Sequence, residues 1–211
     1  MRYLILLISL FVVDLKANED FIFNKSSNGV VVIFSESSLG SGAIITDSGY
    51  VLTNYHVVEG HSELEVLIKN ADSYEEAKHT ANVIKTDKHK DLALLKITNP
   101  RVRLFPIKIS KVVPKIGAEA HAIGHPEGLI WSYTKGYISQ KRYDYEWAYS
   151  DKYSMEATVY QIQTPISHGN SGGPLLNKHG NLIGINTFSS LKTDLINYAV
   201  SVEEIIRFLV N

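Results

Sequence analysis

The sequence contains no cysteine among its 211 residues. This absence excludes disulfides, cysteine nucleophiles and thiolate metal sites, so the folded chain must be stabilised by core burial alone. Neither sign of charge dominates, because 21 lysines and arginines are balanced by 22 acidic residues. The composition therefore gives no argument for a nucleic-acid partner or for an anionic membrane surface.

Long hydrophobic runs are also missing. The apolar run Tyr3–Val13 is about half as long as the roughly 20 residues that a membrane-spanning helix needs. It follows a basic start at Arg2 and precedes the polar stretch 18–20, as in a secretory signal peptide cleaved after Ala17. We therefore expect 1–17 to be a leader and the mature chain to be exported, periplasmic or secreted, with no stable membrane insertion after cleavage. A buried N-terminal strand or an uncleaved anchor is the alternative.

The rest of the chain has no repeat, no low-complexity tract and no long linker. Many short apolar and β-branched segments separated by turns predict an all-β sandwich or barrel. The loop 47–49 ends in Gly49, which can take the positive φ that a three-residue hairpin loop needs. The expected strands are 29–34, 43–46, 50–53, 64–69, 81–86, 92–97, 116–123, 159–164 and 182–187.

Three other segments indicate how the rest of the chain is organised. The stretch 99–114 is the best candidate for a join between two halves of the molecule, and the aromatic stretch 142–156 predicts a long surface loop or a hairpin extension. Near the C-terminus, apolar residues recur at helical spacing, which predicts a helix at 202–210. Ser201 and Glu204 form the capping-box pattern that would begin this helix.

A glycine-rich stretch surrounds Ser171 in the sequence HGNSGGP, His168–Pro174. Alone, such a stretch is typical of a turn. A serine nucleophile also needs an imidazole base, a carboxylate to orient that base, and N–H donors for the oxyanion. The small residues allow the amides of Gly169 and Ser171 to point into one pocket.

A candidate base and a candidate acid occur earlier in the chain. His56 directly follows an apolar predicted strand, and Asp91 opens the apolar segment DLALLKI. Taken singly, a histidine after a strand and an aspartate at the head of one are more often structural. Together with Ser171 they predict a Ser-His-Asp triad.

The chain resembles the trypsin-like serine proteases, most closely the Do-like (HtrA) bacterial branch. The resemblance rests on GSGAIITDSGYVLTNYHVV, DLALLKI and GNSGGPLLNKHGNLIGINT in that order, with HAIGHP and NYAV in support. It implies a chymotrypsin-like fold of two perpendicular antiparallel β-barrels and a short C-terminal helix. The implied protease domain is 18–211, with barrels at about 25–105 and about 110–200 and the helix at 202–210.

The resemblance also implies the role of each site residue. His56 would be the general base and then the acid, Asp91 the orienting carboxylate, and Ser171 the nucleophile. The amides of Gly169 and Ser171, with Asn170 between them, would form the oxyanion hole. Asn170 stands where digestive relatives have an aspartate that pairs with a new N-terminus, so we expect no zymogen step.

The sequence departs from the Do-like branch after the C-terminal helix, where those proteases usually carry a PDZ domain. We expect no such domain here, and an oligomer is possible but unsupported. None of the residues expected to form the substrate pocket is a carboxylate, which favours a small or medium apolar residue before the scissile bond over Lys or Arg. Its expected walls are Thr164, Pro165, Ile166, Thr187, Phe188, Ser189 and Ile196. His168 binding an acidic residue is the alternative.

No cofactor and no metal are expected. His121 and His125 are four residues apart, but that spacing joins two ligands only on a helix, and the segment reads as a strand followed by a turn. The sequence thus predicts an exported serine endopeptidase that acts on protein or peptide substrates, in quality control or degradation of partly unfolded proteins. The alternative is a catalytically silent, protease-fold binding or holdase module. An esterase or lipase is disfavoured because the G-x-S-x-G elbow and a Ser-before-His order are absent.

Overall fold

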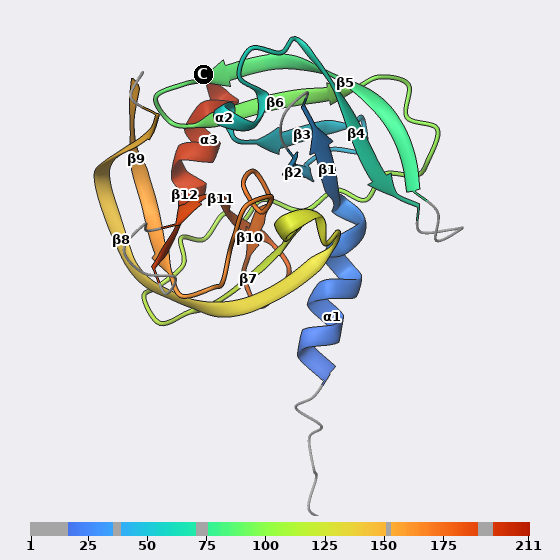
Figure 1. The fold of residues 1–211 in the computed structure, drawn as a ribbon. Coiled ribbons are helices and arrows are strands. Elements are labelled where there is room, and N and C mark those ends of the chain that lie inside the picture. The colour runs from blue at the N-terminus through green and yellow to red at the C-terminus, as the bar shows by residue number, and fades with distance from the viewer. Residues whose placement is uncertain (1–16, 36–38, 71–75, 151–152, 190–195) are drawn as a thin grey trace, which may run out of the picture.

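The computed structural model describes residues 17–35, 39–70, 76–150, 153–189 and 196–211. Within them, the strands form two closed antiparallel barrels, one in each half of the chain (Figure 1). The N-terminal barrel consists of β1 (Val30–Phe34), β2 (Leu39–Ile44), β3 (Tyr50–Thr53), β4 (Glu63–Lys69), β5 (Glu76–Asp87) and β6 (Leu92–Ile97). The C-terminal barrel consists of β7 (Glu119–Gly124), β8 (Ser132–Ser150), β9 (Tyr153–Ile162), β10 (Pro174–Leu176), β11 (Leu182–Ser189) and β12 (Asn197–Ser201).

The all-β prediction and its chymotrypsin-like form are confirmed. The β2–β3 hairpin turns through Gly49, whose φ of 90° is the positive value expected for that loop. Two strands, β10 and β12, and the first half of β8 were not predicted. β10 is only three residues long and lies inside the glycine-rich region, so its sequence has no room for an alternating pattern.

The aromatic stretch 142–156 forms a hairpin rather than a loose loop. β8 pairs with β9 from Ile138 opposite Ile162 to Ser150 opposite Tyr153. Trp147 on this hairpin stacks on Phe188 of β11, with ring centroids 5.0 Å apart. Trp147 therefore buries its ring against the second barrel, and this packing stabilises the hairpin.

In the described residues, three α-helices accompany the barrels: α1 (Ala17–Ser26), α2 (Tyr55–Val58) and α3 (Val202–Val210), with short 3₁₀ turns η1 (Ser27–Gly29) and η2 (Pro126–Gly128). The sequence predicted only α3. α1 lacks a helical apolar stripe, yet its Ile22 is fully buried against the body of the protein. Residues 1–16 lie outside the described part, so the leader and its cleavage after Ala17 stay predictions. None of the described helices is long and apolar enough to span a membrane.

The predicted capping box of α3 forms only in part. The backbone N–H of Glu204 donates to the hydroxyl of Ser201 (3.4 Å), as expected. The carboxylate of Glu204 lies instead against β9, where it accepts from the backbone N–H of Thr158 (3.2 Å). It also accepts from the guanidinium of Arg207 in the same helix (2.8 Å). α3 is thereby fastened to the hairpin strand β9.

The two barrels meet over a shared apolar core. A single cluster of buried residues includes Val30, Leu52 and Leu92 from the first barrel and Ile123 and Ile185 from the second. The segment between β6 and β7, which contains the predicted join, bonds to both barrels. Its Ile107 N–H donates to Ile44 O, and its Lys108 O accepts from the N–H of Leu182, both at 2.8 Å.

Candidate active site

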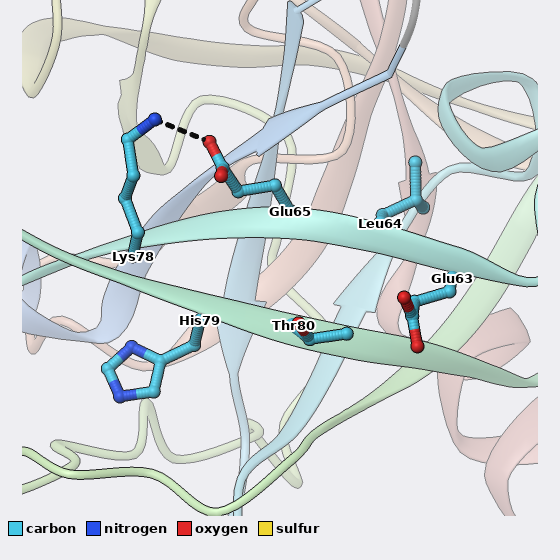
Figure 2. Close-up of a pocket in the computed structure, with 6 residues that line it drawn as sticks. All are labelled: Glu63, Leu64, Glu65, Lys78, His79 and Thr80. Atoms are coloured by element: carbon cyan, nitrogen blue, oxygen red, sulfur yellow. Dashed lines mark hydrogen bonds and ion pairs between the residues drawn. The ribbon is translucent and has the colours of Figure 1, made fainter.

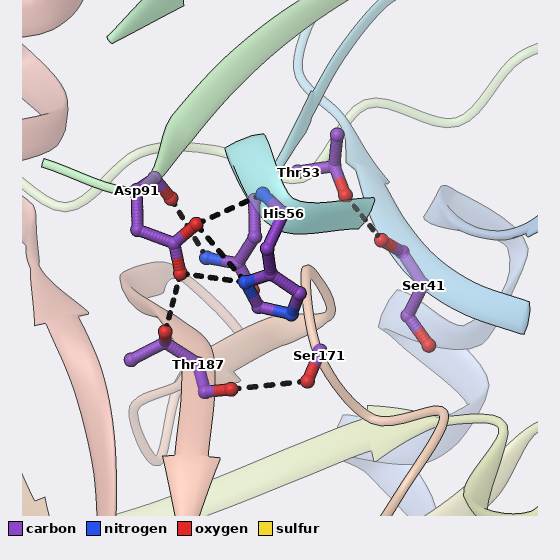
Figure 3. A network of polar contacts seen from close by, with 7 residues as sticks. Ser41, Thr53, His56, Asp91, Ser171 and Thr187 are labelled. Carbon is purple, nitrogen blue, oxygen red and sulfur yellow. Dashed lines mark hydrogen bonds and ion pairs between the residues drawn. The ribbon is translucent and has the colours of Figure 1, made fainter. Parts of the chain in front are cut away.

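The residues predicted as a triad lie where the two barrels meet (Figure 3). His56 is in α2, the short helix that follows β3, and Asp91 is in the turn before β6. Ser171 comes from the loop between β9 and β10 of the other barrel. Two groups on one barrel and one on the other are therefore brought together, although they are far apart in the sequence.

His56 and Asp91 are in direct contact. The imidazole Nδ1 lies 2.8 Å from Oδ2 and 3.0 Å from Oδ1 of Asp91, and the backbone N–H of His56 donates to Oδ1 (3.0 Å). The Asp91 side chain is fully buried and that of His56 is 4% exposed. Because an ionised carboxylate accepts but does not donate, this contact favours the tautomer with the proton on Nδ1. Nε2, which faces Ser171 in Figure 3, is then the basic nitrogen.

The carboxylate of Asp91 has a third partner that the sequence did not reveal. The hydroxyl of Thr187, which we predicted as part of the substrate pocket, donates to Oδ2 of Asp91 at 2.5 Å. Thr187 is only 1% exposed. A buried charge is tolerable only when hydrogen bonds surround it, so the Thr187 hydroxyl stabilises the carboxylate, and the place of Thr187 in the substrate pocket stays a prediction.

The backbone at Asp91 also requires support. Its φ of 53° lies in the left-handed region, which costs a non-glycine residue about 1–2 kcal/mol. The side-chain amide of Asn54 donates to the carbonyl of Asp91 (2.9 Å), and Asn54 is fully buried. Asn54 thus fixes the turn that presents Asp91. Its place two residues before His56 in TNYH was the only sequence signal for this role.

Ser171 is half-buried, and its hydroxyl donates to the carbonyl of Thr187 (3.0 Å; Figure 3). A hydroxyl has one proton, so the hydroxyl must rotate before that proton can pass to His56. Catalytic hydrogen bonds in substrate-free enzymes commonly tighten only when the substrate binds. The arrangement can therefore support nucleophilic chemistry once a substrate displaces this resting contact.

The loop between β9 and β10, which contains Ser171, is called the serine loop below. Ser41 of β2 forms hydrogen bonds to it from the opposite barrel. Its backbone N–H donates to the carbonyl of Ser171 (2.8 Å), and its hydroxyl donates to the carbonyl of Gly169 (2.7 Å). The carbonyl of Ser41 in turn accepts from the hydroxyl of Thr53 (2.7 Å; Figure 3). Gly172 has a φ of 83°, and a Cβ there would overlap Ser41 and Thr53. Only glycine fits at this position.

The predicted oxyanion residues lie side by side in this loop. The N–H of Asn170 donates to the carbonyl of Ser167 (3.0 Å) and is therefore in use. Among the described residues, the amides of Gly169 and Ser171 donate to no backbone carbonyl outside helices and strands. These two amides are the donors that remain for a ligand oxygen.

Of the other predicted pocket residues, Thr164 is fully buried, and a hydrogen bond joins the stretches 164–166 and 187–189. The hydroxyl of Ser189 donates to the carbonyl of Ile166 (3.3 Å), which links the stretch before the serine loop to the end of β11. Phe188 and Ile196 are half-buried, and Pro165 is exposed. Residues 190–195, between Ser189 and Ile196, lie outside the described part, so that side of the pocket is not described.

The histidines considered as metal ligands point to other partners. His121 Nδ1 lies 2.7 Å from the hydroxyl of Tyr133, and His125 Nδ1 accepts from the backbone N–H of Trp131 (3.0 Å). In the described part of the chain, no three His, Cys, Asp or Glu side chains group as a metal site would require.

A hollow lies away from this site, on strands β4 and β5 of the N-terminal barrel (Figure 2). Its lining is polar, and an exposed ion pair between Lys78 and Glu65 (2.8 Å) crosses it. Exposed ion pairs of this kind contribute little to stability. None of the predicted site residues lines this hollow.

Comparison with known proteins agrees with the geometry. A family model described as a trypsin-like peptidase domain matches residues 40–185, a range that contains all three triad positions. The chain is 38% identical over 149 residues to Protease Do-like 1, chloroplastic, of Arabidopsis thaliana, covering 70% of this chain and 32% of that protein. It is 39% identical over 150 residues to the Probable periplasmic serine endoprotease DegP-like of Pseudomonas savastanoi pv. phaseolicola, covering 71% and 29%.

A solved structure shares most of this chain's fold. The serine endoprotease from Yersinia pestis superposes with a TM-score of 0.75 at 30% identity, covering 90% of this chain and 65% of that one. The chain spans less than a third of the length of the two curated relatives named above.

Proposed function

Because the chain belongs to the trypsin-like peptidase family, we propose that it is a serine endopeptidase that uses Ser171 as nucleophile. His56 accepts the proton of the Ser171 hydroxyl and later donates it to the leaving amine. Asp91 keeps the imidazole in the required tautomer and stabilises its charged form. The observation that carries the proposal is the bonded pair of His56 and Asp91 (2.8 Å), whose second ring nitrogen faces Ser171.

The oxyanion that forms on the substrate carbonyl is stabilised by the amides of Gly169 and Ser171. One such preorganised donor accelerates acyl transfer by about 10²–10³. The hydrogen bonds from Ser41 support this role, because they hold the carbonyls of Gly169 and Ser171 and leave their amides for the ligand. Hydrolysis of the acyl intermediate repeats the same proton transfers with water as the nucleophile.

The substrates in this proposal are proteins or peptides with a small or medium apolar residue before the scissile bond. The expected walls 164–166 and 187–189 contain no carboxylate that would pair with Lys or Arg. The Pseudomonas relative is named as a periplasmic endoprotease. With the predicted leader, this supports export and a role in degrading partly unfolded proteins.

An activity-based probe tests the proposal. The purified chain is incubated with a fluorophosphonate at neutral pH, and its digestion of casein is followed in parallel. We expect labelling and digestion, both lost in Ser171→Ala with no change in the circular dichroism spectrum. A folded wild-type protein that is neither labelled nor proteolytic would instead support the silent binding module.

A further inference from the structure

The amide of Gly169 can stabilise an oxyanion only if the peptide between His168 and Gly169 has one orientation. The carbonyl of His168 accepts from the backbone N–H of Glu127 in η2 (2.8 Å). A trans peptide directs its C=O and N–H to opposite sides. By holding this carbonyl, Glu127 therefore sets the direction of the Gly169 N–H. The loop 125–131 of the second barrel thus reaches the predicted oxyanion hole through one backbone bond.

This loop also packs closely under Gly169. Gly169 has a φ of 94°, and a Cβ there would overlap the carbonyl oxygen of His125. The loop itself is in a costly conformation, since Glu127 and Trp131 have φ values of 50° and 52°. Left-handed backbone at such residues persists only where the surroundings enforce it. Contacts between the loop 125–131 and its surroundings must therefore hold it in this conformation.

The imidazole of His125 is well placed to do so. It is fully buried, its Nδ1 accepts from the backbone N–H of Trp131 (3.0 Å), and the two rings meet edge to face at 5.4 Å. The indole N–H of Trp131 then donates to the carbonyl of Val30 in β1 (3.0 Å). Burial lowers the pKa of His125 to about 4, against a smaller opposite effect of the Val31 backbone. The ring is thus neutral near pH 7, and Nδ1 retains the lone pair that it uses.

We propose that His125 is a positioning residue for catalysis: its imidazole keeps the loop 125–131 in the shape that directs the Gly169 amide at the oxyanion. This inference rests on the proposed function, since it concerns the same active site. The positioning role of His125 differs from a packing role in one respect. A packing residue needs only the right volume, whereas this role needs a hydrogen-bond acceptor at the position of Nδ1.

The first test compares His125→Leu with His125→Asn. Leucine fills space but accepts no hydrogen bond, whereas the asparagine Oδ1 can occupy nearly the same position as the histidine Nδ1. We expect kcat for a peptide substrate to fall by about 10- to 100-fold in His125→Leu with KM within about threefold, because one oxyanion donor is misdirected. We expect His125→Asn to recover most of the lost rate. Binding of a peptide boronate, which needs the same amides, should weaken in parallel with kcat.

His121→Leu is the matched control. His121 is another buried histidine of the same barrel (1% exposed), but its ring contacts Tyr133 rather than the loop 125–131. We expect it to lower thermal stability and to leave kcat within about threefold of the wild type. If it lowers kcat as far as His125→Leu does, the effect is one of general packing and the proposal is wrong.

Other outcomes separate the two proposals. A wild-type chain without labelling or cleavage contradicts the proposed function itself. An active wild type with full kcat in folded His125→Leu, or with no recovery in His125→Asn, overturns the positioning role alone. Should His125→Leu fail to fold, Trp131→Phe tests the same loop by removing the indole N–H that bonds to Val30 and part of the ring that meets His125. A drop in kcat of at least about threefold is then expected, and an unchanged kcat in folded Trp131→Phe contradicts the proposal.

Discussion

The proposed chemistry depends on the hydroxyl of Thr187. It donates to Asp91 inside the protein, where the carboxylate has no access to water. Thr187→Val keeps the shape and removes the donor. Leaving a buried acceptor short of one bond costs about 1–3 kcal/mol, so we expect a corresponding loss of stability and about a 10-fold lower kcat/KM. Thr187→Ser keeps the hydroxyl and should retain both, as measured by urea unfolding and peptide hydrolysis.

His125 gives a second prediction at the residue scale, concerning pH. Its pKa falls from 6.5 to about 4 on folding because burial disfavours the charged ring. As pH drops below 6.5, the unfolded state binds the proton first, so the free energy of unfolding decreases until about pH 4. This residue alone accounts for a loss of about 3 kcal/mol across that window. Urea unfolding at pH 7 and pH 4 measures this decrease in the free energy of unfolding. We expect the decrease to be smaller by about 3 kcal/mol in His125→Asn than in the wild type. Equal pH dependence in the two proteins would contradict the assignment.

At the scale of elements, the β8–β9 hairpin connects stability to the substrate site. Trp147 is 8% exposed and stacks on Phe188, the residue next to Thr187. Replacing a buried tryptophan by alanine costs about 3–5 kcal/mol. We therefore expect Trp147→Ala to lower the melting temperature and to raise KM, because Phe188 loses its support. Tyr143 on the same hairpin is 70% exposed, and Tyr143→Ala should change stability by less than about 0.5 kcal/mol.

The elements also show which parts of the molecule can be predicted from sequence. Strands with apolar, β-branched residues, such as β1 and β6, were found because their pattern follows from burial. The helix α1 was missed because, among its residues with described side chains, Ile22 is the only fully buried apolar one, and one residue makes no periodic signal. Asn54, Ser41 and the loop 125–131 were missed for a related reason. Their roles depend on contacts between distant segments, as in the bond from Glu127 to His168, and spacing along the chain does not record such contacts.

At the scale of the whole molecule, each barrel has its own buried cluster, and the two share a third cluster and one site. A single buried cluster contains residues of both barrels, and the hydroxyl of Ser41 bonds the serine loop from across the interface. Neither barrel can lose its structure without exposing apolar surface of the other. We therefore expect thermal unfolding to be one cooperative transition, with equal calorimetric and van't Hoff enthalpies. Leu95→Ala in the first barrel and Ile183→Ala in the second, both buried, should lower the midpoint of that same transition by removing core contacts. Two resolved transitions, each moved by only one of these variants, would show instead that the barrels unfold independently.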